Sequence, residues 1–132
     1  FGSEQPEQLD VNLPVHQIGR LQDHVSMVLL YSACDVFVLP SLQDNLPNTL
    51  IESLACGTPC IAFDTGGISD IIQHQQNGYL AQFKDTGDLA KGIQWTLEQL
   101  LQPSIIHQNT VKHYNLPHIT EQYSQLYQSL SR

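Results

Sequence analysis

Two acidic residues, Asp44 and Glu52, stand on either side of a polar loop, with seven residues between them. The loop, residues 45–49, leads into a segment that is predicted to be helical. The first turn of a helix has unpaired N–H groups and a partial positive charge, so this loop can seat an anionic group. A carboxylate beside it can accept hydrogen bonds from ligand hydroxyls. The residue types therefore indicate a site for a small polar ligand.

The elements around this loop alternate between strand and helix. Continuous apolar runs bounded by Pro or Gly predict strands, and helical stretches that end near Gly or a polar loop separate them. This order predicts an α/β fold, a Rossmann-like parallel sheet with flanking helices. The expected strands are 16–18, 35–39, 60–63 and 79–81, and the expected helices are 23–33, 49–56 and 68–74.

The last part of the chain, about residues 87–131, is predicted to be helical without strands. It carries two apolar stripes at helical spacing, which predict two faces buried in the core. The first stripe comprises Leu89, Ile93, Leu97, Leu100 and Leu101, with Trp95 near its edge, and the second comprises Ile119, Tyr123, Leu126, Tyr127 and Leu130. The helix expected at residues 23–33 also has one side that carries mostly apolar residues. That side comprises Val25, Val28, Leu29 and Ser32.

Length and composition predict one small domain, residues 1–132, with 41% hydrophobic and 14% charged residues. Five Lys and Arg residues against thirteen Asp and Glu residues give a formal charge of -8. This balance disfavours a surface that binds nucleic acid or an anionic membrane, but it allows a single bound nucleotide. No apolar run is long enough to cross a bilayer.

The potential metal ligands are scattered. Cys34, Cys56 and Cys60 lie in apolar sequence without a CxxC motif, which predicts reduced, buried thiols in a cytosolic protein. Gly57 and Pro59 separate the last two cysteines, and none of the six His residues forms a metal-spaced pair with a carboxylate. We therefore expect no metal. His16 and His24 remain weak candidates for a general base.

The stretch Pro40-Ser-Leu-Gln-Asp-Asn-Leu-Pro-Asn-Thr-Leu-Ile-Glu-Ser-Leu-Ala-Cys-Gly-Thr-Pro59 resembles the signature of retaining glycosyltransferases of the GT-B fold, the family GT4 or glycosyl transferases group 1. The family motif has two acidic residues with seven between them, then a helix of the Glu-Ala-Met-Ala-Cys-Gly type. The resemblance extends from Leu29 through Thr65-Gly-Gly67 and Asn77-Gly-Tyr-Leu80, about half of the chain. It implies a nucleotide-sugar-binding domain, the C-terminal half of a GT-B enzyme.

The resemblance also implies roles for individual residues. Glu52 matches the residue that binds the ribose hydroxyls. Asp44 matches the acidic catalytic residue near the donor sugar, which binds the hydroxyls of that sugar or supports the charge that develops on it. The loop between them would bind the diphosphate, and the segment after the first strand would contact the base. Those loop residues are Asn45, Leu46, Pro47, Asn48 and Thr49, and the base-contacting residues are Gly19, Arg20 and Leu21.

Local sequence alone permits structural alternatives. Thr49-Leu-Ile-Glu52 is also a capping box, in which Glu52 reaches back to the helix start. Asp44 and Asn45 fit a simple turn, and Asn48 fits a helix cap. Arg20 is equally consistent with an exposed, solvated side chain. Gly66-Gly67 indicate either a backbone that approaches a ligand, or a turn that needs positive φ.

Some features depart from the family pattern. Asp44 replaces the usual Glu, and Leu46-Pro47 replaces a frequent Phe-Gly. The family's upstream glycine-rich loop and basic pair are absent, and Phe1-Gly-Ser3 resembles the end of the preceding strand. We therefore expect an N-terminally truncated domain that is inactive alone.

The function predicted from the resemblance is retaining transfer of a hexosyl-type sugar from a nucleotide-diphosphate sugar to a glycan or lipid-linked acceptor, in cytoplasmic polysaccharide or glycan biosynthesis. The acceptor would bind a missing N-terminal domain, and no cofactor is expected. Two alternatives stay open. The chain is a non-catalytic GT-B-like binding module, or it is a relative of nucleotide-sugar epimerases.

Overall fold

The computed structural model describes residues 13–130, and Phe1-Gly-Ser3, predicted to end a strand, lies outside them. Three short strands form a parallel sheet in the order β1 (Phe37–Leu39), β2 (Cys60–Phe63) and β3 (Gly78–Ala81). The register pairs Val38 with Ile61 and Ile61 with Tyr79. All four residues of β2 are buried, as the continuous apolar run Cys60-Ile-Ala-Phe63 predicts for a central parallel strand.

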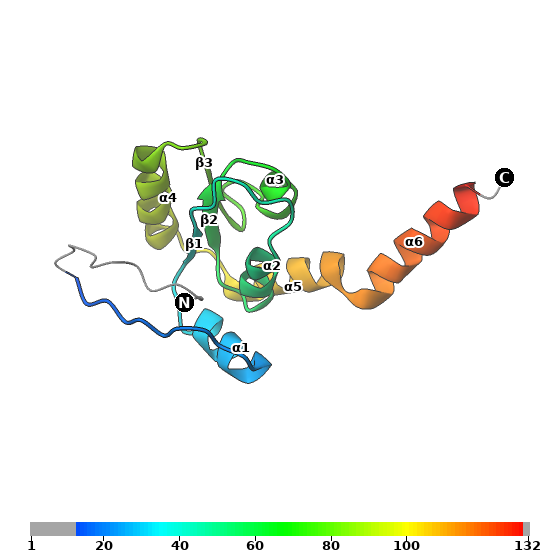
Figure 1. Ribbon diagram of the computed structural model, residues 1–132, viewed down its shortest axis with the longest axis horizontal. Coiled ribbons are helices and arrows are strands. Elements are labelled where there is room, and N and C mark those ends of the chain that lie inside the picture. The colour runs from blue at the N-terminus through cyan, green and yellow to red at the C-terminus, as the bar shows by residue number, and fades with distance from the viewer. Residues whose placement is uncertain (1–12, 131–132) are drawn as a thin grey trace.

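Helices cover both faces of this sheet (Figure 1). Helix α4 (Thr86–Glu98) packs against β3 and β2, and α2 (Asn48–Ala55) packs against β1 and β2 from the other side. Helices α1 (His24–Ser32) and α5 (Pro103–Tyr114) both contact α2. The short helix α3 (Ile68–Ile71) follows β2, and α6 (Leu116–Leu130) follows α5. This is the predicted α/β arrangement with additional C-terminal helices.

The core lies between α2, α3, α5 and the sheet. It is built from aliphatic residues that the sequence places on one side of each element, so that each helix buries a single stripe. The buried members are Leu50, Leu54, Cys60, Ala62, Ile68, Ile71, Ile72 and Ile106. Helix α5 contributes Ile106 to this cluster, which explains why it packs closely along α2.

The predicted strand 16–18 is absent, and the prediction is wrong. Residues 13–20 are exposed, and no strand of the described part of the chain lies beside them to supply hydrogen bonds. Without a partner, an apolar pattern cannot form a sheet.

Strand β1 is also shorter than the predicted 35–39 and only half-buried, because it forms the edge of the sheet in the described residues. Helix α3 stops at Ile71 and not at the predicted position 74.

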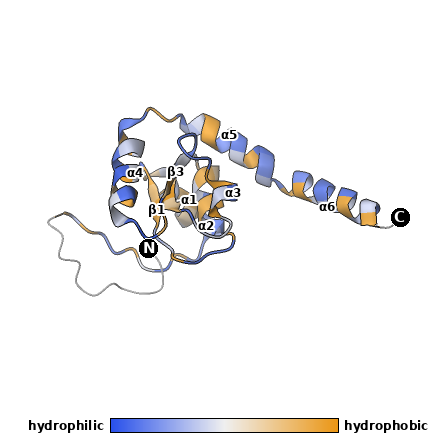
Figure 2. Cartoon of the chain, turned by 90° about the horizontal axis from the view of Figure 1, so that it is seen from above, coloured by the Kyte–Doolittle hydropathy of each residue, from blue (hydrophilic) through white to orange (hydrophobic). Residues whose placement is uncertain are grey.

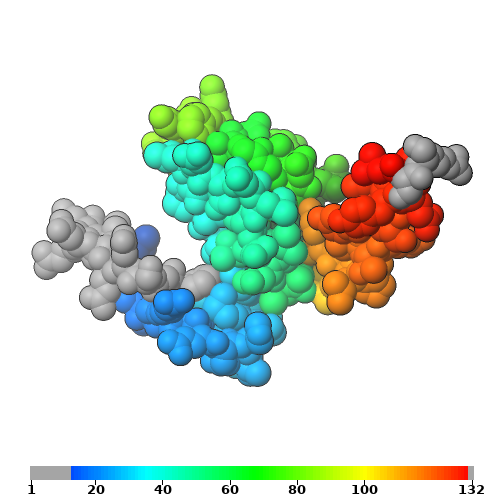
Figure 3. All heavy atoms as spheres, turned by 45° about the vertical axis from the view of Figure 1, so that its right-hand side comes forward, coloured from blue at the N-terminus to red at the C-terminus, as the bar shows by residue number. Residues whose placement is uncertain are grey.

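The two C-terminal stripes were predicted to be core, and this is largely wrong. In α4 the buried residues are Thr96 and Gly92, which lies against the Tyr79 ring, while Leu97 is exposed. Leu100, which follows the end of α4, is also exposed. In α6 no residue is buried. Figure 1 shows α6 extending away from the sheet beyond α5, and Figure 3 shows its red atoms standing off the body of the domain. Figure 2 shows hydrophobic residues along this projecting helix.

Two smaller expectations also need correction. In α1 the residues that were predicted to share one side of the helix are all exposed, and Tyr31 is the buried residue. The exposed residues are Val25, Val28, Leu29 and Ser32. Of the three cysteines, all of which are free thiols, only Cys60 is buried. Cys56 is half-buried and Cys34 is exposed, since it follows the end of α1 where the chain turns at the surface.

Candidate functional site

Two loops meet at the carboxyl edge of the sheet. One follows β1 and carries Asp44 and Asn45, and the other follows β2 and carries Gly66 and Gly67. A Cβ on Gly66 would overlap the carbonyl oxygen of Asp44, and one on Gly67 would overlap that of Asn45. Gly66 also has a φ of 56°, a conformation that favours glycine. The glycine pair therefore lets the β2 loop pack directly onto the backbone of the acidic loop.

The first turn of α2 has no side-chain cap. Its N-cap is Pro47, which offers no side-chain cap, and Asn48 is the first helical residue with an exposed side chain. The alternative in which Asn48 caps the helix is therefore wrong. No side chain hydrogen-bonds to this end of the helix, so the first-turn N–H groups other than that of Leu50, which donates to the Pro47 carbonyl oxygen, can donate to an anion. The helix dipole also favours negative charge there.

Glu52 does not form the capping box that local sequence permits. It lies in the second turn of α2, too far along to cap a helix that begins at Asn48. Its Oε2 instead accepts a hydrogen bond from the hydroxyl of Tyr31, at 3.3 Å. Burial and the negative charge of Glu52 both raise the pKa of Tyr31, so this tyrosine remains a neutral donor. Glu52 itself is exposed, which leaves its other oxygen available to a ligand.

A groove of about 710 Å³ runs beside Glu52, between α1 and the paired helices α2 and α5. It brings together Glu52 and Leu21, two predicted donor-binding residues that are far apart in the sequence. Tyr31 forms part of its wall. The remaining lining residues are Gln22, Asp23, His24, Met27, Val28, Ala55, Cys56, His107 and Val111. The volume of the groove lies within the usual range for small-molecule sites and is large enough for a ligand of nucleoside size.

Other predicted residues lie outside this groove. Gly19 and Arg20 are exposed and do not line it, and Gly19 has a φ of 71°. Asp44, Asn45, Leu46, Pro47, Asn48 and Thr49 are grouped at the sheet edge and the start of α2, and none of them lines the groove. The site therefore has two parts, which α2 connects: an open helix terminus and a groove that begins at Glu52.

Two side chains in this region were not singled out from the sequence. Tyr31 interrupts an aliphatic helix, and a buried tyrosine usually needs a hydrogen-bond partner, which was a usable signal. His107 lies in α5, and its Nδ1 is 2.5 Å from the carbonyl oxygen of Ala55. Nothing in the local sequence indicates that contact, because it joins residues 52 positions apart. His24 lines the groove, whereas His16 is exposed and does not line it.

Within residues 13–130, no group of three or more His, Cys, Asp or Glu side chains is arranged to hold a metal ion. None of the described helices is long and apolar enough to span a membrane.

A parallel sheet with helices on both faces and a ligand-accessible carboxyl edge defines the class of α/β nucleotide-binding domains. The family described as glycosyl transferases group 1 matches residues 3–113 of this sequence. The chain therefore belongs to this glycosyltransferase family.

Individual relatives agree with that assignment. The N-acetyl-alpha-D-glucosaminyl L-malate synthase of Bacillus anthracis is 38% identical over 88 residues, which cover 67% of this chain and 22% of that protein. An N,N'-diacetylbacillosaminyl-diphospho-undecaprenol alpha-1,3-N-acetylgalactosaminyltransferase of Campylobacter jejuni is 34% identical over 84 residues, covering 64% of this chain and 22% of that protein.

A solved structure has the same fold. The sucrose-phosphate synthase of Thermosynechococcus elongatus superposes with a TM-score of 0.73 at 32% identity, over 86% of this chain and 29% of that one. The fold is thus that of the GT-B glycosyltransferases. The chain spans about a quarter of the length of the relatives that it matches.

Proposed function

We propose that this chain binds the donor of a glycosyltransferase, a nucleotide-diphosphate sugar. The observation that carries the proposal is that Glu52 and Leu21 line one groove, although 31 positions separate them in the sequence. A carboxylate at the edge of a nucleoside-sized groove can accept hydrogen bonds from two neighbouring ribose hydroxyls. The uncapped start of α2, one turn before Glu52, is the matching position for a diphosphate.

Each predicted residue then has a role along the bound donor. Leu21, with Gly19 and Arg20 just before it, contacts the base, and Glu52 binds the ribose. Asn48 and Thr49 present backbone N–H groups to the diphosphate. Asp44 lies beyond them at the sheet edge, where it contacts the transferred sugar or stabilises the charge that develops on it. The short supply of basic residues in the chain makes the helix terminus the principal anion-binding element.

The complete reaction that we propose is transfer of a hexosyl-type sugar, with retention of configuration, to a glycan or lipid-linked acceptor in the cytoplasm, as a step of polysaccharide or glycan biosynthesis. Donor and acceptor must be brought together in one closed site for this chemistry. In those two relatives the matching residues make up only 22% of the protein. We therefore expect that the 132-residue chain binds donor without transferring sugar.

The test is an amide-resolved NMR titration of the chain with UDP, GDP and ADP in parallel. We expect saturable shifts at residues 45–52 and 19–21 with one of the three nucleotides. Glu52→Ala should abolish them, and the matched control Glu98→Ala, which changes an exposed helical glutamate of α4, should leave them unchanged. Shifts that persist in Glu52→Ala would remove Glu52 from the site.

If none of the three nucleotides produces saturable shifts, a second titration follows. The same three nucleotides are titrated into a longer chain that also carries the family's upstream glycine-rich loop and basic pair. Absence of binding there as well would favour the non-catalytic binding module.

A further inference from the structure

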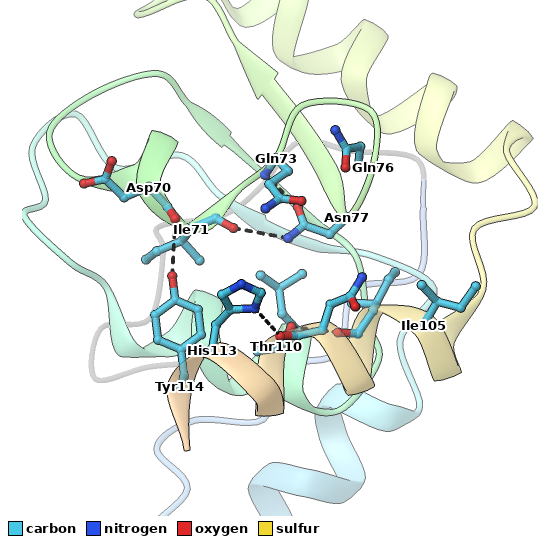
Figure 4. Close-up of a pocket in the computed structure, with 12 residues that line it drawn as sticks. Asp70, Ile71, Gln73, Gln76, Asn77, Ile105, Thr110, His113 and Tyr114 are labelled. Atoms are coloured by element: carbon cyan, nitrogen blue, oxygen red, sulfur yellow. Dashed lines mark hydrogen bonds between the residues drawn. The ribbon is translucent and has the colours of Figure 1, made fainter. Parts of the chain in front are cut away.

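A second pocket, of about 330 Å³, lies on the other side of α2 from the groove that contains Glu52. Its walls are the segment 70–77 on one side and α5 on the other (Figure 4). It shares no lining residue with the groove beside Glu52. The pocket is therefore a separate site, and what it binds does not depend on the donor proposal.

The frame of this pocket is held by internal hydrogen bonds. The side chain of Asn77 accepts from the backbone N–H of Gln73 at 2.8 Å and donates to the carbonyl oxygen of Ile71 at 3.1 Å. The Tyr114 hydroxyl donates to the carbonyl oxygen of Asp70 at 3.3 Å, so it joins α5 to the opposite wall. These bonds fix the turn and the helix relative to each other without using the polar groups at the rim.

The rim groups are free to bind a ligand. The side-chain amides of Gln73, Gln76 and Asn109 form no hydrogen bond with any residue of the described range 13–130. His113 places Nδ1 2.8 Å from the carbonyl oxygen of Asn109, so Nδ1 must carry the proton of that bond. In the neutral ring, Nε2 is then an acceptor. Together these groups offer both donors and acceptors.

The pocket has no positive side chain of Lys or Arg that would recognise an anion. No Lys or Arg lines it, and Asp70 contributes its backbone carbonyl while its carboxylate points outward in Figure 4. The floor is apolar, because Leu54, Ile71 and Ile106 are buried beneath the polar rim. A phosphate or a carboxylate would therefore find no counter-charge, and a purely apolar ligand would leave the amides unsatisfied.

We propose that this pocket binds one ring of a neutral carbohydrate. Side-chain amides pair well with neighbouring hydroxyls, since each amide supplies a donor and an acceptor, and the C–H face of a pyranose can lie on the aliphatic floor. The volume is at the lower end of the usual range for small-molecule sites, as a single sugar ring requires. In a glycosyltransferase family member, such a site would hold a glycan chain apart from the donor groove.

The test is NMR titration of the isotope-labelled 132-residue chain with methyl α-D-glucopyranoside, with inorganic phosphate and N-methylacetamide as separate probes. We expect saturable shifts at residues 73–77 and 109–114 with the glucoside only, with a dissociation constant of about 1–10 mM, as is usual for a small neutral ligand. Saturation by phosphate or N-methylacetamide at the same amides, or no saturable shift with glucoside at 100 mM (about ten times the weakest expected constant), would overturn the proposal.

Matched variants separate binding from structure. Asn109→Ala should weaken glucoside binding about fivefold, the effect of one lost hydrogen bond, and the double variant with Gln76→Ala should abolish it. Gln108→Ala changes the neighbouring exposed residue of α5, which does not line the pocket, and should have no effect. Equal affinities for Asn109→Ala and Gln108→Ala would contradict the assignment. Because all three residues are exposed, we expect each variant to keep the fold, which circular dichroism checks.

Discussion

The hydroxyl of Tyr31 lies 3.3 Å from Oε2 of Glu52 and so connects α1 to α2. Tyr31 is only 2% exposed, and its position is fixed by two further contacts. Its ring meets Phe37 edge-on at 5.4 Å, and its carbonyl oxygen accepts a hydrogen bond from the Thr58 hydroxyl at 2.7 Å. A rigid buried donor thus holds an exposed carboxylate at the edge of the groove.

Removal of the Tyr31 hydroxyl should affect binding more than folding. Tyr31→Phe keeps the ring and its contact with Phe37, so we expect the free energy of unfolding to fall by about 1 kcal/mol, the value of one hydrogen bond. Nucleotide affinity should fall several-fold, because Glu52 loses its orientation. The control is Tyr114→Phe, which also loses one hydroxyl hydrogen bond but lies away from the groove. Equal nucleotide affinities for the two variants would show that Tyr31 does not position Glu52.

The contact between the two loops at the sheet edge predicts different costs for two glycine substitutions. Gly66→Ala would strain a left-handed φ and overlap the Asp44 carbonyl, whereas Gly19 has a similar φ but nothing within 4 Å of the added Cβ. We expect Gly19→Ala to cost about 1 kcal/mol from φ alone. Gly66→Ala should cost about 2–4 kcal/mol, because steric overlap is added to the strain. Urea denaturation of both variants measures the difference.

The main apolar contribution of helix α5 to the stability of the domain should come from Ile106. Ile106 is buried in the core, and Ile105 beside it is 49% exposed. We expect Ile106→Ala to lower the free energy of unfolding by about 2–4 kcal/mol, through lost burial and the cavity that remains. Ile105→Ala serves as the matched control and should cost less than about 1 kcal/mol. Thermal and urea denaturation would contradict this account if the two costs were similar.

Alkaline pH should destabilise the fold through Cys60. Burial raises the pKa of this thiol from 9.0 to about 12. Because the pKa is raised, the folded state holds the proton above pH 9 while the unfolded state releases it. The stabilisation is therefore complete below pH 9 and is lost as the pH rises from 9 to about 12. Urea denaturation at pH 8 to 11 should show a steeper decline for the unmodified chain than for Cys60→Ala, in which the titrating thiol is absent.

The elements that could be predicted from sequence are those whose signals are local. Strand β2 has the predicted bounds 60–63, because a continuous apolar run between Pro59 and a polar turn admits few other structures. Helix α2 is displaced by only one residue from the predicted 49–56. The predicted strand 16–18 and the buried face of α6 both failed for the same reason: an apolar pattern shows that a partner surface is favourable, but not that the surface is present.

Some features of the candidate site could likewise be predicted from the sequence, and others could not. The acidic pair and the loop at the start of α2 could be identified from residue types and spacing, since both lie in one short stretch. The bond between Tyr31 and Glu52, the contact of Gly66 with Asp44, and the wall that α5 adds to the groove could not. Each depends on segments more than 20 residues apart, and their relative placement follows from packing across the whole sheet.

Helix α6 has no buried residue, and it contacts the rest of the domain through α5. Its hydrogen bonds are therefore maintained by intrinsic helix propensity and by neighbours along the same helix, such as Tyr123 and Tyr127, whose ring centroids are 6.4 Å apart. A helix of this length is marginal without packing. Its backbone amides should therefore exchange with deuterium by local fraying, far faster than those of β2, which exchange only when the core opens.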